Sequence, residues 1–300
     1  MARSSPAVPW RSPGLNLVQR FYPLLFVFLW STGFIGAKLG LPHAEPLSFL
    51  LTRYGLVIAL MLIIALATRA PWPEKRRDWL HIGISGVLVH AVYLGGVFVA
   101  IKHGLPAGVT ALVVGMQPLL TAFGAGWLLG ERVSARQWAG LGLGFVGVGM
   151  VVSAKLGDGA LGPMLIPAVV ALLGITAGTL YQKRFCPKFD LRTGSVIQFV
   201  PTAIITAMAV AMFEDYRIVW NGQFMFALGW LVLDLSLGAI SLLNLLIRSG
   251  SAVNVAALFY LTPPTTALIA YFIFGENLTL IAAFGMLVAV SGVYLVAKTK

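Results

Sequence analysis

A stretch of about fifty residues occurs twice in this chain, and the two copies align without a gap at a spacing of 145 positions. Comparing 106–155 with 251–300 gives 13 identical pairs in 50 positions. Shared apolar composition would produce a few identities by chance, but it would not align proline, glycine and glutamate in the same order. The most informative pairs are Pro118 with Pro263, Gly130 with Gly275, and Glu131 with Glu276. The chain therefore carries an internal duplication of about half its length.

The composition decides the class of protein into which this duplication folds. Hydrophobic residues make up 59% of the chain, charged residues only 10%, and the mean hydropathy is +0.90. A soluble domain carries about 25% charged residues, so this chain cannot cover a surface that faces water. A large soluble core would need polar faces between its apolar runs, and these are missing. We predict an all-α polytopic membrane protein that has the lipid bilayer as its solvent.

Ten apolar runs are each close to the 20 or so residues that a helix needs to span a bilayer. They are 21–38, 47–68, 80–101, 106–129, 137–153, 161–181, 194–213, 224–246, 252–274 and 278–297. We expect a cytoplasmic tail at 1–20, a first five-helix repeat at 21–155 and a second at 156–300. Because five is odd, the second repeat must cross the membrane in the opposite sense to the first. This inverted topology places a pseudo-two-fold axis in the membrane plane and predicts a site near the midplane, between the repeats.

The net charge of +11 would suggest nucleic acid as a partner if the chain were soluble. Here Lys and Arg lie in short loops, where they are better explained as topology determinants, so we expect no nucleic-acid partner. With the N-terminus in the cytoplasm, sixteen basic residues fall in inside segments and three in outside loops: Lys102, Lys155 and Arg217. We therefore expect both termini to be cytoplasmic.

Prolines interrupt two spans at repeat-equivalent positions. Pro118 lies within the fourth span, and Pro263-Pro264 within the ninth. Proline removes backbone hydrogen bonds, so a kink is expected at each site. A static kink is the simpler interpretation, but the symmetric placement favours Pro118, Pro263 and Pro264 as hinges.

Glycines in the fifth span form the string Gly142-x-Gly144-x-x-Gly147, which matches a dinucleotide-binding fingerprint. No strand precedes it, so we interpret Gly140, Gly144, Gly147 and Gly149 as small residues that let helices approach closely.

Two charged residues lie within spans. Asp234 is the only acid near the middle of one, and Gly238, Ser241 and Arg248 share its helical face, with Asn244 at the edge. An intramembrane charge is a functional hypothesis by default, here substrate binding or proton coupling, against a structural carboxyl as the alternative. Arg53 in the second span is interpreted as reaching the interface, with carboxylate binding as the less favoured alternative. Lys38 and its repeat equivalent Lys183 are expected to extend to the interface in the same way.

Aromatic and polar side chains near the midplane are the remaining candidates for binding. Trp30, Tyr93 and Tyr260 would suit a cavity for an aromatic or apolar solute, although each alone could simply pack. Gln117, Ser241 and Asn244 are the candidate polar contacts, with helix–helix hydrogen bonding as the alternative for each.

Catalytic and metal-binding patterns do not occur. The four histidines are scattered, and the one cysteine, Cys186, excludes an intrachain disulfide. We predict no metal, no cofactor and no catalytic residue. A membrane-embedded enzyme and a pore are the weaker alternatives.

The ten spans, the inverted halves, the Gln117-Pro118 kink and the Gly-Glu pairs that end the fourth and ninth spans resemble the drug/metabolite transporter superfamily. The resemblance covers about 20–298, and the chain looks most like EamA-type exporters of aromatic amino acids. It implies a secondary transporter of the bacterial inner membrane, with alternating access around a cavity lined by the third, fourth, eighth and ninth helices. Its expected cargo is phenylalanine, tyrosine, tryptophan and similar small metabolites, exported by a monomer or weak homodimer. A broad exporter of drugs or other metabolites is the alternative.

Overall fold

The computed structural model describes residues 17–105, 110, 113–153, 163, 165–186, 188–275 and 278–298. Glu276, most of the expected tail and the expected junction at 155/156 lie outside these residues. Every named element in the described part is a helix. In chain order they are α1 (Leu17–Gly40), η1 (Leu41–His43), α2 (Pro46–Ala67), α3 (Arg76–Gly86), η2 (Val87–Leu94), α4 (Gly95–Lys102), α6 (Gln117–Leu129), α7 (Ala135–Ser153), α8 (Leu165–Phe185), α9 (Leu191–Phe213), α10 (Gly222–Trp230), η3 (Leu231–Ala239), α11 (Ile240–Ser249), α12 (Ala252–Ala257), η4 (Leu258–Leu261), α13 (Thr262–Phe274) and α14 (Leu280–Ala297).

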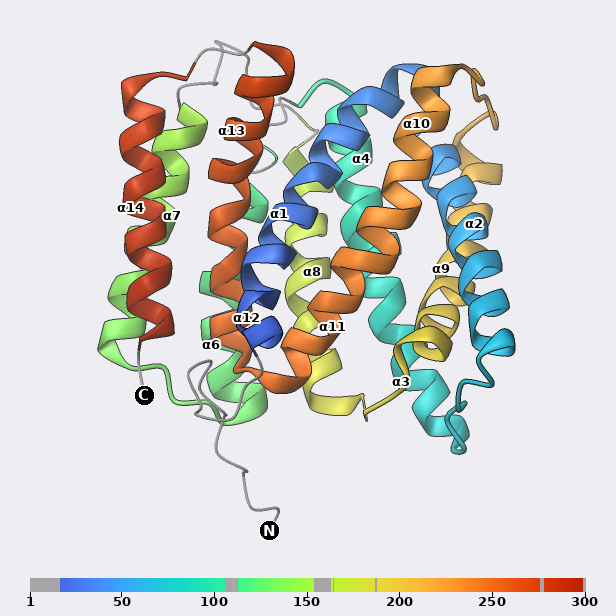
Figure 1. The fold of residues 1–300 in the computed structure, drawn as a ribbon, viewed down its shortest axis with the longest axis horizontal. Coiled ribbons are helices and arrows are strands. Elements are labelled where there is room, and N and C mark those ends of the chain that lie inside the picture. Colours follow the sequence, from blue (N-terminus) through green and yellow to red (C-terminus); the bar gives the residue numbers. More distant parts are fainter. Residues whose placement is uncertain are drawn as a thin grey trace.

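These elements make a membrane-spanning bundle (Figure 1). Within the described residues, nine helical stretches are long and apolar enough to cross a membrane. The expected fourth span, 106–129, contributes α6, and part of its first half lies outside the described residues. The fold is thus the predicted all-α membrane architecture of two inverted five-helix repeats.

The duplication is visible element by element. Helix α13 begins and ends 145 residues after α6, and each of these helices ends on a left-handed glycine, Gly130 with φ +68° and Gly275 with φ +63°. A left-handed cap favours glycine because it has no Cβ to clash. The predicted Gly pair therefore terminates equivalent helices in both repeats.

A π-helical turn interrupts the same span of each repeat. The turn η2 lies in the third span, and η3 lies 145 residues later to within one residue, in the eighth. The five-residue step is visible in the backbone N–H of Ile240, which donates to the carbonyl of Leu235. Because a π turn inserts a residue into the helical repeat, side chains beyond it leave the face that α-helical spacing predicts.

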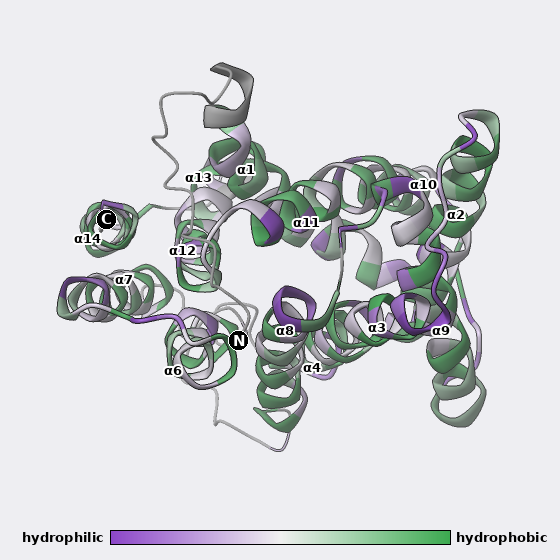
Figure 2. Cartoon of the chain, turned by 90° about the horizontal axis from the view of Figure 1, so that it is seen from below, coloured by the Kyte–Doolittle hydropathy of each residue, from purple (hydrophilic) through white to green (hydrophobic). Residues whose placement is uncertain are grey.

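Equivalent helices pair at the two edges of the bundle, α7 with α14 and α2 with α9 (Figure 2). A Cβ on Gly140 would lie 2.7 Å from the carbonyl oxygen of Gly292, and one on Gly147 would lie 2.7 Å from that of Gly285. Since Gly285 and Gly292 are the repeat equivalents of Gly140 and Gly147, this contact maps onto itself when the repeats are exchanged.

The close approach of α7 and α14 confirms the small-residue interpretation for Gly140, Gly144 and Gly147. For Gly149 the interpretation is wrong, because a Cβ there would meet no atom within 4 Å. Gly149 occupies the face of α7 that points away from the crossing.

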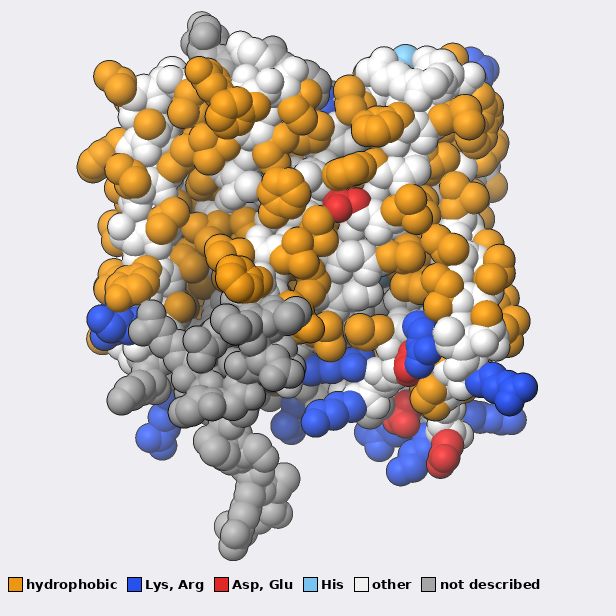
Figure 3. Space-filling model, in the orientation of Figure 1, with side chains coloured by type: hydrophobic (Ala, Val, Ile, Leu, Met, Phe, Trp, Pro, Cys, Tyr) orange, Lys and Arg blue, Asp and Glu red, His pale blue; other side chains and the backbone are white. Residues whose placement is uncertain are grey.

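Charged side chains gather at one end of the bundle, where α14 ends and α3 begins (Figures 1 and 3). We call this the basic end. Its described Lys and Arg residues are Arg69, Lys75, Arg76, Arg77, Arg132, Arg136, Lys183, Arg184, Lys188, Arg192, Arg248 and Lys298. Apolar side chains predominate over the remaining height of the face shown in Figure 3, where one acidic side chain lies among them in the upper half. This is the character that lipid contact requires.

Candidate functional site

A pocket of about 580 Å³ extends from the middle of the bundle toward the end opposite the basic end. We call it the aromatic pocket. Its walls come from α1, η1, η2, α4, α7, η4 and α13, together with Val114 and Gly115 ahead of α6. Its lining residues include Trp30, Phe34, Lys38, Leu41, Pro42, Tyr93, Lys102, Val151, Phe259, Thr262, Pro263 and Thr266. This conformation is therefore open away from the basic end.

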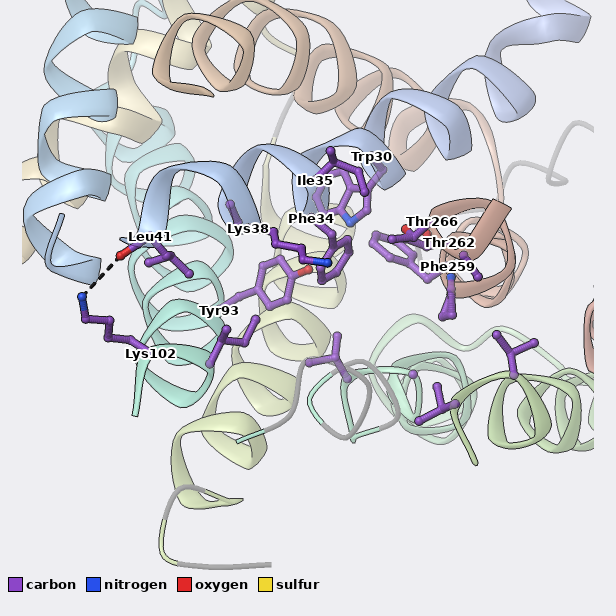
Figure 4. A pocket seen from close by; sticks show the side chains of 18 of the residues that line it. Trp30, Phe34, Ile35, Lys38, Leu41, Tyr93, Lys102, Phe259, Thr262 and Thr266 are labelled. Atoms are coloured by element: carbon purple, nitrogen blue, oxygen red, sulfur yellow. Dashed lines mark hydrogen bonds between the residues drawn. The ribbon is translucent and has the colours of Figure 1, made fainter. Parts of the chain in front are cut away.

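Aromatic rings form the deep wall of the pocket (Figure 4). The rings of Trp30 and Tyr93 stack with centroids 6.3 Å apart and planes 14° apart. Phe259 meets Trp30 edge-on, at 5.1 Å and 82°. Stacked and edge-on pairs fix ring positions, so this wall presents a rigid apolar face to a bound solute.

Two lysines belong to the same lining. The side chain of Lys38 points across the pocket toward Tyr93 and Phe34 (Figure 4). The ammonium of Lys102 donates to the carbonyls of Leu41 and Ala44, both at 3.3 Å, and lies 3.7 Å from a carboxylate oxygen of Glu45. No acidic residue is among the lining residues in the described part of the chain. The pocket thus combines aromatic walls with positive charge.

A network of buried amides closes the bundle between the pocket and the basic end. The amide of Gln182 donates to Asn244 at 2.8 Å, and the amide of Gln198 donates to Ser85 at 3.1 Å. Longer contacts of 3.5 Å join Gln198 to Gln182 and to Asn244. Buried polar groups that satisfy one another in this way hold helices in one arrangement. We call these four residues the amide seal.

Lysine 183 reinforces the closure. Its ammonium donates to the carbonyl oxygen of Ile247 at 2.7 Å and to that of Gly250, where α11 ends. The expectation that Lys183 extends to the interface stays a prediction. In this structure its ammonium satisfies free carbonyls at the C-terminus of α11, at the basic end.

Arg53 is fully buried, so the expectation that it reaches the interface is wrong. Its Nε and Nη2 donate to the hydroxyl of Ser236 at 3.0 and 2.9 Å. Tyr54, Tyr93 and His90 lie within electrostatic range. Arg53 itself does not line the aromatic pocket.

Three residues proposed as sites lie in the pocket lining: Trp30, Tyr93 and Pro263. Three others, Gln117, Pro118 and Tyr260, are buried outside it, while Pro264 and the partly buried Ser241 also lie outside it. Asn244 belongs to the amide seal.

Asp234 is half-buried and accepts a hydrogen bond of 2.7 Å from the hydroxyl of Thr32 on α1. It does not line the aromatic pocket, and neither does any other residue of the eighth span. The resemblance implied that the eighth span is a cavity wall, whereas in this conformation α1 forms that wall instead. Asp234 lies within the turn η3 and Asn244 lies beyond it in α11, so the α-helical spacing that placed them on neighbouring faces does not hold.

The prolines Pro118 and Pro263 stand where an α-helix begins, and in the second repeat that helix continues directly from the 3₁₀ turn η4. Pro118 and Pro263 each occupy the first turn of a helix, in α6 and α13, after the preceding segment has ended. Proline is tolerated there because the first-turn N–H has no partner within the helix. The predicted interruptions are therefore breaks between two helices, and a hinge role for these prolines stays a prediction.

Sequence reasoning missed Phe34, Phe259 and both lysines as pocket residues. A signal was available for part of them: Trp30, Phe34 and Lys38 recur at spacings of four, which places them along one face of α1. In the same way Phe259, Thr262 and Thr266 are three and four residues apart, a spacing that places them along one helical face. For Ser236 no signal existed, because the π turn that aims it at Arg53 leaves no mark in the sequence.

Comparisons with known proteins agree with this architecture. The model of the EamA-like transporter family matches residues 20–153 and 162–298, one match for each half. An uncharacterised inner membrane transporter, YedA of Escherichia coli K12, is 25% identical over 94% of both chains. A probable amino-acid metabolite efflux pump of Salmonella typhimurium is 30% identical, over 45% of this chain and 43% of that protein. A solved structure with 21% identity superposes with a TM-score of 0.75 and covers 92% of this chain and 94% of its own.

Proposed function

The chain belongs to the EamA-like transporter family, and on that premise we propose that it exports aromatic amino acids and related small metabolites from the cytoplasm. That it is a membrane transporter follows from the family. The aromatic cargo, the direction and the mechanism are the proposal. The relative named as an amino-acid metabolite efflux pump supports this class of cargo.

The observation that carries the proposal is the composition of the aromatic pocket. Trp30, Tyr93 and Phe259 offer ring faces and edges to an aromatic side chain. Lys38 offers positive charge to a carboxylate, whereas the ammonium of Lys102 is already paired with Glu45. A volume of about 580 Å³ is within the range of small-molecule sites. An aromatic amino acid has both features that this lining can bind.

Orientation follows from charge. The basic end carries most of the Lys and Arg residues, and cytoplasmic loops are enriched in these residues. We therefore place the basic end in the cytoplasm, with both termini there. The conformation described here would then be open to the outside and sealed toward the cytoplasm.

The repeat suggests which residues would line the cavity when the protein opens toward the cytoplasm. The pocket residues Thr262 and Thr266 have Gln117 and Thr121 as their repeat equivalents. Gln117 and Thr121 are fully buried, and their side chains have no hydrogen-bond partner among the described residues. Buried polar groups without partners are costly, and exposure to a cytoplasmic cavity would hydrate them. We propose alternating access in which the repeats exchange conformations, with the breaks at Pro118 and Pro263-Pro264 as pivots.

The test is uptake of labelled phenylalanine, tryptophan and leucine into proteoliposomes, with and without a pH gradient. Faster uptake of the two aromatic amino acids supports the proposal. A dependence on the gradient would indicate proton coupling, and its absence would indicate facilitated transport. Equal uptake of leucine, or no uptake of any of the three, would contradict the aromatic assignment.

A broad exporter of drugs is the alternative, favoured by the mostly apolar lining. The absence of an acidic group among the described lining residues argues against cationic drugs. Competition of tryptophan uptake by a cationic aromatic drug separates the two functions, because strong competition would favour the broad exporter.

A further inference from the structure

One buried cation lies behind the aromatic pocket without a counter-ion. Arg53 is 0% exposed, and within the described residues no carboxylate forms an ion pair with it. Two of its three nitrogens share a single acceptor, the hydroxyl of Ser236. The third, Nη1, has no hydrogen-bond partner in the part of the chain that the structure describes.

This arrangement is unfavourable by itself. A buried guanidinium needs an anion or a full set of acceptors, since removal of a charge from water is costly. A neutral hydroxyl supplies neither, and Ser236 also donates its own proton to Leu231. Among the described residues, the titratable groups that interact electrostatically with Arg53 are Tyr54, Tyr93 and His90, and none of them is a carboxylate.

The position of Arg53 connects this charge to the transport path. Tyr93 lines the aromatic pocket and lies within electrostatic range of the guanidinium. Tyr93 and His90 come from the π turn η2, and Ser236 comes from the equivalent turn η3. Widened π turns are frequent at functional sites and place side chains where an α-helix would not. Both repeats thus direct their irregular turns toward Arg53.

We propose that Arg53 is a carboxylate-binding residue, whose free Nη1 pairs with the carboxylate of the cargo when Tyr93 moves aside during the transport cycle. The inference rests on the proposed function for the identity of the cargo. A guanidinium suits this role because it remains charged when buried and binds carboxylates through several donors. Lys38 would attract the anion in the pocket, and Arg53 would bind it at depth.

The test compares ligands that differ only in the carboxylate. Binding of phenylalanine, 3-phenylpropionate and phenethylamine is measured on the purified full-length protein and on Arg53→Gln. Arg53→Gln should weaken the two carboxylates by about tenfold or more, the loss typical of a charged hydrogen bond, and should leave phenethylamine nearly unchanged. Arg217→Gln is the matched control, because Arg217 is exposed and pairs with Asp215.

Two further variants separate binding from structure. Arg53→Lys keeps the charge and should restore part of the carboxylate affinity. Ser236→Ala removes the present partner of Arg53 and should preserve carboxylate binding. If Ser236→Ala instead weakens all three ligands, or weakens the two carboxylates as much as Arg53→Gln does, the pair is structural and the inference is overturned.

The remaining outcomes are also decisive. Equal loss of phenylalanine and phenethylamine in Arg53→Gln, or loss of neither, overturns the inference. If the wild-type protein binds no aromatic compound, the proposed function fails, and acetate and lactate are used in a thermal-shift assay. Stabilisation of the wild type but not of Arg53→Gln would support a carboxylate site, and equal behaviour would refute it.

Discussion

The two repeats of this protein share their backbone far more closely than their side chains. Their helices begin and end at equivalent positions, and both contain a π turn, a helix break before proline and a left-handed glycine cap. The side chains at equivalent positions differ around the aromatic pocket, where the bundle is open, and in the amide seal, where it is closed. Arg53 in the first repeat corresponds to Gln198 in the second, and Trp30 corresponds to Ile175.

Gln198 lies in the amide seal with three partners, whereas Arg53 has one and retains a free nitrogen. At equivalent positions of the two repeats, Gln198 therefore helps to close the basic end, whereas Arg53 keeps a nitrogen that can still donate a hydrogen bond to a partner. The comparison teaches that duplication preserved the parts that determine helix packing, while substitution gave the two ends different chemistry.

The largest effect is expected when the basic end is locked shut by a covalent cross-link. In a Cys186→Ser background, Gln182→Cys and Asn244→Cys place two thiols where a 2.8 Å hydrogen bond now joins the side chains. Cross-linking with a short bifunctional thiol reagent should abolish transport, because the basic end could no longer open. The control is the same variant before cross-linking, and undiminished transport after cross-linking would refute alternating access.

A second change tests the shared packing. Gly147→Val would place a side chain 2.7 Å from the carbonyl oxygen of Gly285 and should destabilise the protein by about 1–3 kcal/mol, the cost of overpacking. Thermal unfolding in detergent measures the effect. Gly149→Val is the matched control, since a Cβ there meets nothing within 4 Å. Equal melting temperatures for the two variants would contradict the α7–α14 crossing.

A third change weakens the amide seal and uses the native cysteine as the reporter. Gln198→Ala removes the hydrogen bond to Ser85 and should favour opening of the basic end by about 1 kcal/mol, or about fivefold in population. Cys186 lies beside this end, half-buried, so its rate of modification by a maleimide should rise accordingly. Gln223→Ala, at the opposite end, is the control. An unchanged rate would mean that the seal does not govern access.

The same thiol gives a pH dependence. Burial raises the pKa of Cys186 from its ordinary value of 9.0 to about 11. At pH 8 the reactive thiolate should therefore be about a hundredfold scarcer than in an exposed cysteine. The modification rate should keep rising through pH 10, where that of a free thiol levels off, and a rate that levels off near pH 9 would contradict the burial of this group.

The smallest effect is expected at Asp234. Asp234→Asn keeps an acceptor for the hydroxyl of Thr32 and lies away from the aromatic pocket. Transport should change by less than about twofold, as for most substitutions outside a critical contact. A tenfold lower transport rate, or loss of the response to a pH gradient, would instead indicate that Asp234 takes part in substrate binding or proton coupling.

Much of the fold could be predicted because the strongest signals are local or repeated. Apolar runs give the spans, and the 145-residue spacing gives the two inverted halves and the glycine caps. The packing of Gly140 and Gly147 also followed, since small residues in a span have few other uses. Gly149 shows the limit of this prediction. The sequence does not distinguish a glycine at the helix crossing from one on the opposite face of the same helix.

The site was less accessible to sequence reasoning. Trp30 and Tyr93 could be predicted as pocket residues because large aromatics near the midplane of a transporter are few. The environments of Asp234, Arg53 and Ser236 could not be predicted, because Asp234 and Ser236 lie within the π turn η3 and the partner of Arg53 is Ser236. The partners of Asn244 could not be predicted either, because the amide seal joins helices that are distant in the chain.

The π turns bear on the history of the chain as well as on its site. An irregular turn at the same place in both halves is most simply inherited once, from a single ancestral half that already had it. Because the halves cross the membrane in opposite senses, that ancestral five-helix unit had to insert in both orientations and pair with an inverted copy of itself. On that account the uneven distribution of Lys and Arg between the present ends would have followed the fusion, when each half could be held to one orientation.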